Sequence, residues 1–95
     1  MEKVKKMECH LQDEARGAQD YAEKYIFYAN NKPEWAKTYA EMAKQEVSHA
    51  RNLYKMYQES VDEMRWVPED ALEEWKHCVN KTMETIALVE LMLTK

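Results

Sequence analysis

Glycine and proline are scarce in this chain, with one Gly and two Pro among 95 residues. Tight turns and the ends of β-strands consume both residue types, so a chain with so few of them does not suit a β-sandwich or a barrel. Hydrophobic residues make up 45% of the sequence and charged residues 34%, as in long amphipathic helices. The sequence therefore predicts an all-α protein. Its length fits a single domain, residues 1–95, with a modest core that a partner subunit would extend.

Other absences concern the surroundings and partners of the chain. Its two cysteines, Cys9 and Cys78, are too few for a disulfide framework or a zinc cluster. The net charge is −4 and no run of Lys or Arg lies along one face, so we expect no nucleic-acid partner. The basic start MEKVKKMECH is followed by no apolar stretch of signal-peptide type, and no segment approaches the roughly 20 apolar residues of a membrane span. These features predict a cytoplasmic protein that binds neither nucleic acid nor membrane.

Two breaks divide the chain into three helices. In NNKPE at 30–34, the asparagines end one helix and Pro33 begins the next; in RWVPED at 65–70, Pro68 begins a third with two acidic residues in its first turn. The predicted helices span residues 3–30, 33–64 and 68–94. Because the first turn is short, the first two helices form an antiparallel hairpin.

Both helices of the hairpin carry an apolar stripe whose middle is polar. In the first helix, residues alternately three and four apart form the stripe Val4, Met7, Leu11, Glu14, Ala18, Tyr21, Tyr25 and Tyr28. In the second helix the same spacing selects Trp35, Tyr39, Met42, Glu46, His49, Leu53 and Met56. A second, broader stripe lies beside it, formed by Ala36, Ala40, Ala43, Val47, Ala50, Tyr54, Tyr57 and Val61. We expect the polar middle of the two stripes to lie inside the hairpin.

The third helix ends in a segment that is apolar on nearly every side. One face carries Leu72, Trp75, Val79, Met83, Ile86 and Leu93, but IALVELML at 86–93 is hydrophobic almost all round. A helix that is apolar on every side has to be covered on every side. Either another chain covers this end, or it folds back across the hairpin of its own subunit, and the two arrangements are compatible.

Three polar side chains of the hairpin are predicted to meet at one level. Glu14 lies about 18 residues before the centre of the first turn, and Glu46 about 14 residues after it. At about 1.5 Å of rise per residue they reach similar heights, and His49 lies one turn beyond Glu46. A buried carboxylate costs several kcal/mol unless it is neutralised or paired. Carboxylates that meet without a cation repel each other, whereas a multivalent metal ion converts the repulsion into coordination.

The candidate metal ligands are therefore Glu14, Glu46 and His49. A Glu from one helix with Glu-x-x-His from the next is half of the di-iron carboxylate site of four-helix bundles, which needs two such halves. One chain supplies one half. The alternative is that His49 hydrogen-bonds one of the two glutamates as a buried polar pair while the other reaches solvent.

Five further polar or small residues are compared with the candidate site. The second Glu-x-x-His, Glu74 to His77, falls on the side of its helix away from the apolar face, which predicts a solvated surface. His10 lies one turn before the first carboxylate and is either a further ligand, an outer-shell partner or an exposed histidine. Gly17 costs the helix about 1 kcal/mol relative to Ala, and its position three residues after Glu14 suggests room for a close neighbouring backbone or for a ligand. Glu90, near the chain end, is left outside the site.

The segments DEARGAQDYAEKY at 13–25 and YAEMAKQEVSHARNLYKMY at 39–57 resemble the ferritin-like superfamily. Within it the likeness is closest to the encapsulated-ferritin and rubrerythrin-type di-iron proteins. It covers the first two helices, about half of the chain. The quoted features are a Glu followed by small residues and a Tyr, and a Glu-x-x-His-Ala some 30 residues later. The rubredoxin-like cysteines of full rubrerythrins are absent.

The resemblance implies a four-helix ferritin-like bundle completed by dimerisation. It makes Glu14, Glu46 and His49 the iron ligands and catalytic residues of a di-iron ferroxidase centre, each repeated from a second subunit. The implied chemistry is oxidation of Fe(II) by O2 or peroxide, with other divalent metals able to replace iron. The implied partners are a second copy in a homodimer or higher homo-oligomer and, as in encapsulated members, an encapsulating shell protein.

Two other functions remain open from the sequence. One is a non-catalytic helical assembly in which a metal such as Zn or Ca only staples the dimer and so raises its stability. The other is a metal-free bundle that binds a protein partner through the apolar end of the third helix.

Overall fold

The computed structural model describes residues 1–95 as three α-helices without a β-strand. The helices are α1 (Glu2–Tyr28), α2 (Pro33–Glu63) and α3 (Glu69–Leu93). The all-α prediction is confirmed, and each helix end lies within two residues of the predicted one. None of the three helices has a segment apolar enough, over sufficient length, to cross a membrane.

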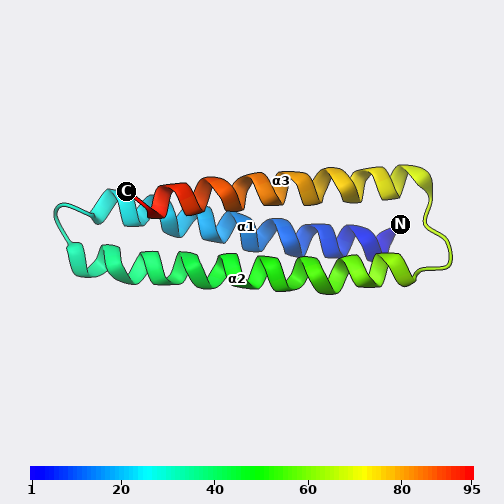
Figure 1. Ribbon diagram of the computed structural model, residues 1–95, viewed down its shortest axis with the longest axis horizontal. Helices are drawn as coiled ribbons and strands as arrows, with labels where there is room; N and C mark the ends of the chain where they lie inside the picture. Colours follow the sequence, from blue (N-terminus) through cyan, green and yellow to red (C-terminus); the bar gives the residue numbers. More distant parts are fainter.

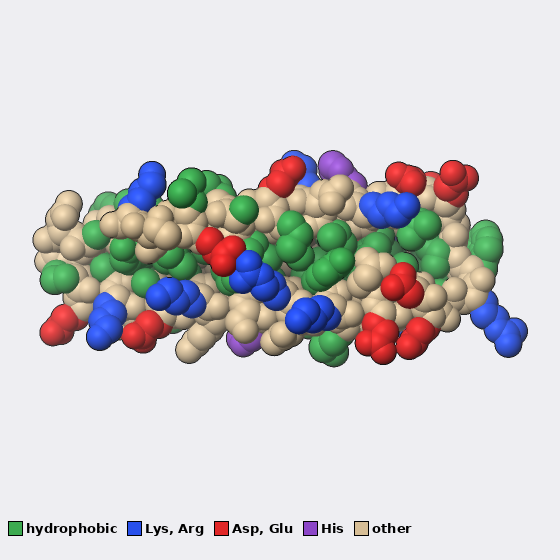
Figure 2. All heavy atoms as spheres, viewed as in Figure 1, with side chains coloured by type: hydrophobic (Ala, Val, Ile, Leu, Met, Phe, Trp, Pro, Cys, Tyr) green, Lys and Arg blue, Asp and Glu red, His purple; other side chains and the backbone are tan.

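The helices form an elongated up-down-up bundle with dimensions of 53 × 18 × 17 Å. As Figure 1 shows, α1 and α2 form an antiparallel hairpin, and α3 returns along it so that the C-terminus lies near the α1–α2 turn. The 31 residues of α2 would span about 46 Å at the usual helical rise, so the bundle is little longer than its longest helix. Helix α1 packs against both other helices, whereas α2 and α3 touch each other sparsely. A band of hydrophobic atoms is visible between rows of charged side chains on the face shown in Figure 2.

Proline and acidic residues define the helix starts. Pro33 occupies the first turn of α2, where its missing N–H would have no helical partner. Pro68 immediately precedes α3, and the carboxylate of Asp70 accepts a hydrogen bond of 2.9 Å from the N–H of Ala71. Met64 is extended, with ψ of 132°, and ends α2. These are the two breaks that the sequence predicts.

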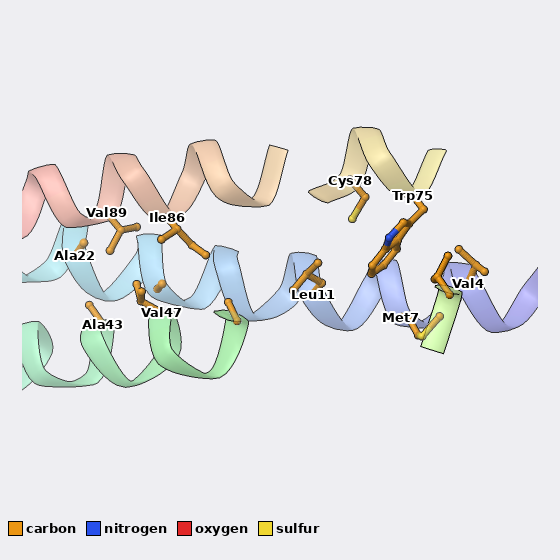
Figure 3. Close-up of a cluster of buried hydrophobic side chains, with 13 residues drawn as sticks. Val4, Met7, Leu11, Ala22, Ala43, Val47, Trp75, Cys78, Ile86 and Val89 are labelled. Carbon is orange, nitrogen blue, oxygen red and sulfur yellow. The ribbon is translucent and has the colours of Figure 1, made fainter. Parts of the chain in front are cut away.

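The core is made of small residues in the hairpin and larger ones in α3. Ala18, Ala22, Ala43 and Ala50 are fully buried, so the α1 and α2 backbones approach closely. From α3, Trp75 points into the core beside Leu11, Met7 and Val4 of α1, as Figure 3 shows. Its indole N–H donates a hydrogen bond of 2.8 Å to Oε1 of Gln58, which satisfies the one polar group of this buried ring.

The expected assignment of the stripes in α2 is wrong in one respect. The alanine-rich stripe is buried, whereas the stripe that carries Glu46 and His49 runs along the edge of the hairpin, with Trp35 50% and Met56 61% exposed. Alanines allow closer contact between two helices than aromatic side chains do, so the small residues take the interface and the large ones lie beside it. The polar middle of the hairpin is therefore half-buried at a groove and does not lie in the centre of the core.

The apolar end of α3 folds back onto the hairpin of its own chain. Ile86 and Val89 are buried against α1 and α2, while Leu88 and Leu91 on the other side are 45% and 59% exposed. Glu90 pairs with Arg51 of α2 at 2.7 Å, so it joins two helices and lies outside the site, as expected.

Truncation of Ile86 tests this packing, because its side chain is buried between the helices. We expect Ile86→Ala to lower the free energy of unfolding by about 2–5 kcal/mol. Leu88→Ala, two residues away in the same helix and 45% exposed, should change it by less than about 0.5 kcal/mol. Urea unfolding followed by circular dichroism measures both values. Equal losses for the two variants would contradict the packing of α3.

Candidate metal centre

Three potential metal ligands converge in the groove between α1 and α2. A carboxylate oxygen of Glu14, one of Glu46 and a ring nitrogen of His49 lie within 4.8 Å of one another. Nδ1 of His49 is 3.9 Å from Oε2 of Glu14 and 3.7 Å from Oε1 of Glu46. The three residues therefore converge at one level of the hairpin, as the sequence predicts. No other place in the chain brings three Asp, Glu, His or Cys ligand atoms together in this way.

The three side chains differ in their exposure to solvent. Those of Glu14 and Glu46 are 22% and 24% exposed, and that of His49 is 57% exposed. The hydrogen bonds and ion pairs of these residues involve only α1 and α2, so the site opens on the side of the hairpin that α3 leaves uncovered.

The only glycine of the chain makes room for one of the carboxylates. A Cβ added to Gly17 would lie 3.1 Å from Oε2 of Glu46, closer than side chains normally approach. Gly17 is one turn after Glu14 on α1 and faces α2 at this point. The sequence predicted space here for a neighbouring backbone or a ligand, whereas a side chain, the Glu46 carboxylate, takes it.

The two carboxylates interact directly. A hydrogen bond shared with Glu14, partial burial and the charge of Glu14 together raise the pKa of Glu46 above its ordinary 4.5, while the nearby His49 lowers it. Two ionised carboxylates this close repel each other, and a shared proton removes the repulsion. The groove therefore favours a positive charge between Glu14 and Glu46, and either a proton or a metal ion can supply it.

A second layer of polar residues adjoins the first. Nε2 of His10 lies 3.6 Å from Oε1 of Glu14, and its Nδ1 is hydrogen-bonded to the hydroxyl of Tyr57 at 2.6 Å. The sequence places Tyr57 in the alanine-rich stripe of α2 and gives no sign of its contact with His10, because the two residues are 47 positions apart. The spacing of residues along a helix predicts which side chains of that helix share a face, but it does not predict contacts with another helix.

The second Glu-x-x-His lies outside the centre. Glu74 and His77 are both exposed, as predicted, and Glu74 pairs weakly with Lys5 of α1 at 4.0 Å. Burial, followed by the charge of Glu74, raises the pKa of the neighbouring Glu8. Burial also raises the pKa of the Cys78 thiol, which favours its protonated form. This region thus contains no convergent ligand set.

Aromatic rings flank the centre towards the α1–α2 turn. Tyr39 of α2 stacks between Tyr21 and Tyr28 of α1, with ring centroids 6.1 Å and 5.7 Å apart. These rings are half-buried between the two helices. They hold the two helices in register next to the carboxylates.

The fold and the site define a three-helix protein with a half-buried Glu-Glu-His cluster between two antiparallel helices. Oxygen and nitrogen ligands of this kind suit Fe, Zn, Mn and related divalent ions. Comparison with protein-family models, with curated proteins and with solved structures gave no significant match.

The shifted pKa of Glu46 predicts how the metal-free protein responds to pH. A carboxyl group whose pKa is raised on folding stabilises the native state fully below its unfolded pKa, and this stabilisation is lost as the pH rises through the native pKa. In chelator at pH 7, Glu46→Gln should therefore be more stable than the wild type, because it removes the repulsion with Glu14. The difference should vanish as the pH falls below about 4.5.

Urea unfolding between pH 4 and 7.5 measures this difference. A bound metal should reverse the order, since a ligand at 100 times its Kd stabilises the wild type by about 2.7 kcal/mol and the variant has lost one ligand. A stability difference that does not change with pH would contradict the predicted interaction of the two carboxylates.

Gly17→Ala separates stability from metal binding. The substitution improves helix propensity by about 1 kcal/mol, but its Cβ displaces the Glu46 carboxylate. We expect unchanged or higher stability in chelator, together with metal binding weakened by about 10-fold or more, measured by titration with Co(II). Asn52→Ala, an exposed change on α2, is the matched control and should leave the affinity unaltered. Equal affinity for Gly17→Ala and the wild type would show that the glycine does not serve the site.

Proposed function

We propose that this chain is an iron-binding protein of ferritin-like type that oxidises Fe(II) with O2 or peroxide at a di-iron carboxylate centre formed between two copies. The observation that carries the proposal is the convergence of Glu14, Glu46 and His49 at one level of an antiparallel hairpin. The ligand types and their distribution over two helices match one half of such a centre. The resemblance of residues 13–25 and 39–57 to ferritin-like proteins supports the same function.

The open side of the hairpin supports the participation of a second copy. No residue of α3 forms an ion pair with Glu14, Glu46 or His49, and the side chain of His49 is 57% exposed, so the cluster is accessible to solvent. Met42 and Leu53, one turn to either side of the Glu46–His49 pair, are half-buried apolar residues at the same edge. A two-fold partner placed there would cover these side chains and supply a second Glu-Glu-His set. The proposed assembly is a homodimer, or a higher oligomer of such dimers.

The ligand chemistry favours oxidation of bound iron. Carboxylate oxygens are hard ligands that prefer Fe(III) over Fe(II), and the exposed side of the site leaves coordination positions for an oxidant. Two Fe(II) ions give up one electron each, so O2 takes up two electrons and two protons and leaves as hydrogen peroxide. When hydrogen peroxide is the oxidant, it takes up one electron from each of two further Fe(II) ions, together with two protons, and is reduced to two molecules of water. The cytoplasm, where the free thiols of Cys9 and Cys78 stay reduced, is the proposed location.

Aerobic addition of Fe(II), followed by the absorbance of the ferric product, tests the activity. We expect Glu46→Ala and His49→Ala to lower the initial rate by more than about 100-fold, since each removes a ligand and even outer-shell changes cost about 10–100-fold. His77→Ala alters the exposed second Glu-x-x-His and should oxidise Fe(II) at the wild-type rate. If the wild type and the three variants gave the same absorbance traces, the proposed enzymatic function would be wrong.

The same proteins distinguish this enzymatic function from a structural role, in which the metal only stabilises the dimer. Size-exclusion chromatography with and without chelator shows whether metal binding and dimerisation are coupled. Metal-dependent dimers that leave Fe(II) unoxidised would identify a structural metal, whereas a wild-type protein without bound metal on elemental analysis would favour a module that binds a protein partner.

A further inference from the structure

The Glu14 carboxylate faces a histidine on each of its two oxygens. Oε2 lies 3.9 Å from Nδ1 of His49, on the side of Glu46, while Oε1 lies 3.6 Å from Nε2 of His10. Both distances exceed a hydrogen bond, so neither contact ties up the ring nitrogen. They are longer than the separation of about 3–3.4 Å between neighbouring ligand atoms on one ion, given metal–ligand bonds of about 2.0–2.2 Å, so a bound ion would draw each nitrogen and oxygen closer together.

The ring of His10 is held in the orientation that a metal ligand needs. Its Nδ1 and the hydroxyl of Tyr57 are 2.6 Å apart, and the two rings are tilted by 52° with centroids 5.9 Å apart. A metal at Nε2 requires the imidazole proton on Nδ1, and the hydroxyl oxygen of Tyr57 can accept it. Ligating histidines almost always have such a partner on their second nitrogen. Tyr57 comes from α2 and His10 from α1, so this hydrogen bond also fixes the two helices next to the site.

We propose that His10 is a further metal ligand, which binds through Nε2 a cation on the second oxygen of Glu14, and that Tyr57 is its positioning residue. Glu14 would then offer one oxygen to a cation held with Glu46 and His49, and the other oxygen to a cation held with His10. This inference rests on the proposed function only in requiring that the Glu-Glu-His cluster binds metal. It gives each chain two imidazole ligands where the Glu-x-x-His sequence supplies one.

The ligand atoms of this proposal favour transition metals. Each of the two cations would then have one imidazole nitrogen and at least one carboxylate oxygen, a mixed ligand set that suits Fe(II), Co(II) and Zn(II) better than Ca(II) or Mg(II). The side chain of His10 is 50% exposed, so the second cation would enter directly from solvent. The set therefore predicts retention of transition metals in the presence of excess Mg(II).

Proton NMR of the Co(II)-loaded protein tests the proposal, because the N–H proton of a Co(II)-bound imidazole gives a strongly shifted, exchangeable signal. We expect two such signals per chain in the wild type. His10→Ala and His49→Ala should each remove one of them, and His77→Ala should remove none. Tyr57→Phe should keep both signals, move the one assigned to His10, and weaken Co(II) binding by about 10–100-fold, as outer-shell changes do. A merely structural hydrogen bond between His10 and Tyr57 would produce no shifted signal from His10.

The outcomes distinguish this inference from the proposed function. If Co(II) binds but His10→Ala retains every shifted signal, the role of His10 is overturned while the Glu-Glu-His centre stands. If the wild type binds no Co(II), Zn(II) or Fe(II), both fail. Circular dichroism in chelator checks the fold of each variant, and His10→Gln, which can keep a hydrogen bond to Tyr57, should lose the same signal as His10→Ala.

Discussion

The close approach of α1 and α2 is the constraint on which the candidate site depends. Alanines at their contact allow the two backbones to lie near each other, and the absence of a Cβ at Gly17 leaves space for the Glu46 carboxylate, which a Cβ would approach to 3.1 Å. Glu14 and Glu46 consequently lie close together, and the proximity of Glu14 together with partial burial raises the pKa of Glu46, because two like charges at this distance repel each other. A proton relieves the repulsion at low pH. A metal ion would relieve it at neutral pH and would gain an imidazole ligand from His49 as well.

The position of the cluster at the edge of the hairpin also decides what it can do. In the centre of the core, the two carboxylates would lose most of their hydration, at a cost of several kcal/mol each. At the groove they keep about a quarter of their side-chain exposure, so ions and a small oxidant can reach them. The same openness leaves the coordination sphere incomplete, which is why the proposed centre needs a second copy of the chain. Helix α3 stabilises the hairpin from the other side and leaves this groove free.

Much of this arrangement follows from the sequence by counting residues. Pro33 and Pro68 mark the two breaks, and the helical rise places Glu14 and Glu46 at the same height of the hairpin. The solvated position of Glu74 and His77 also follows, since they lie opposite the apolar face of α3. Periodicity could not choose which of two adjacent stripes of α2 faces inward, because both are apolar. Packing decided it: the alanine stripe fits a close helix–helix contact, and the stripe with Trp35 and Met56 does not.

The sequence by itself determined the helices, their lengths and the level at which acidic and imidazole side chains meet, because these depend on local backbone preferences and on a fixed rise per residue. Only the tertiary structure decided the depth of the cluster, the use of Gly17 as space for Glu46, and the hydrogen bond between His10 and Tyr57. These three features depend on how side chains of different helices interlock. The spacing of residues along one helix carries no information about the partner that the next helix presents.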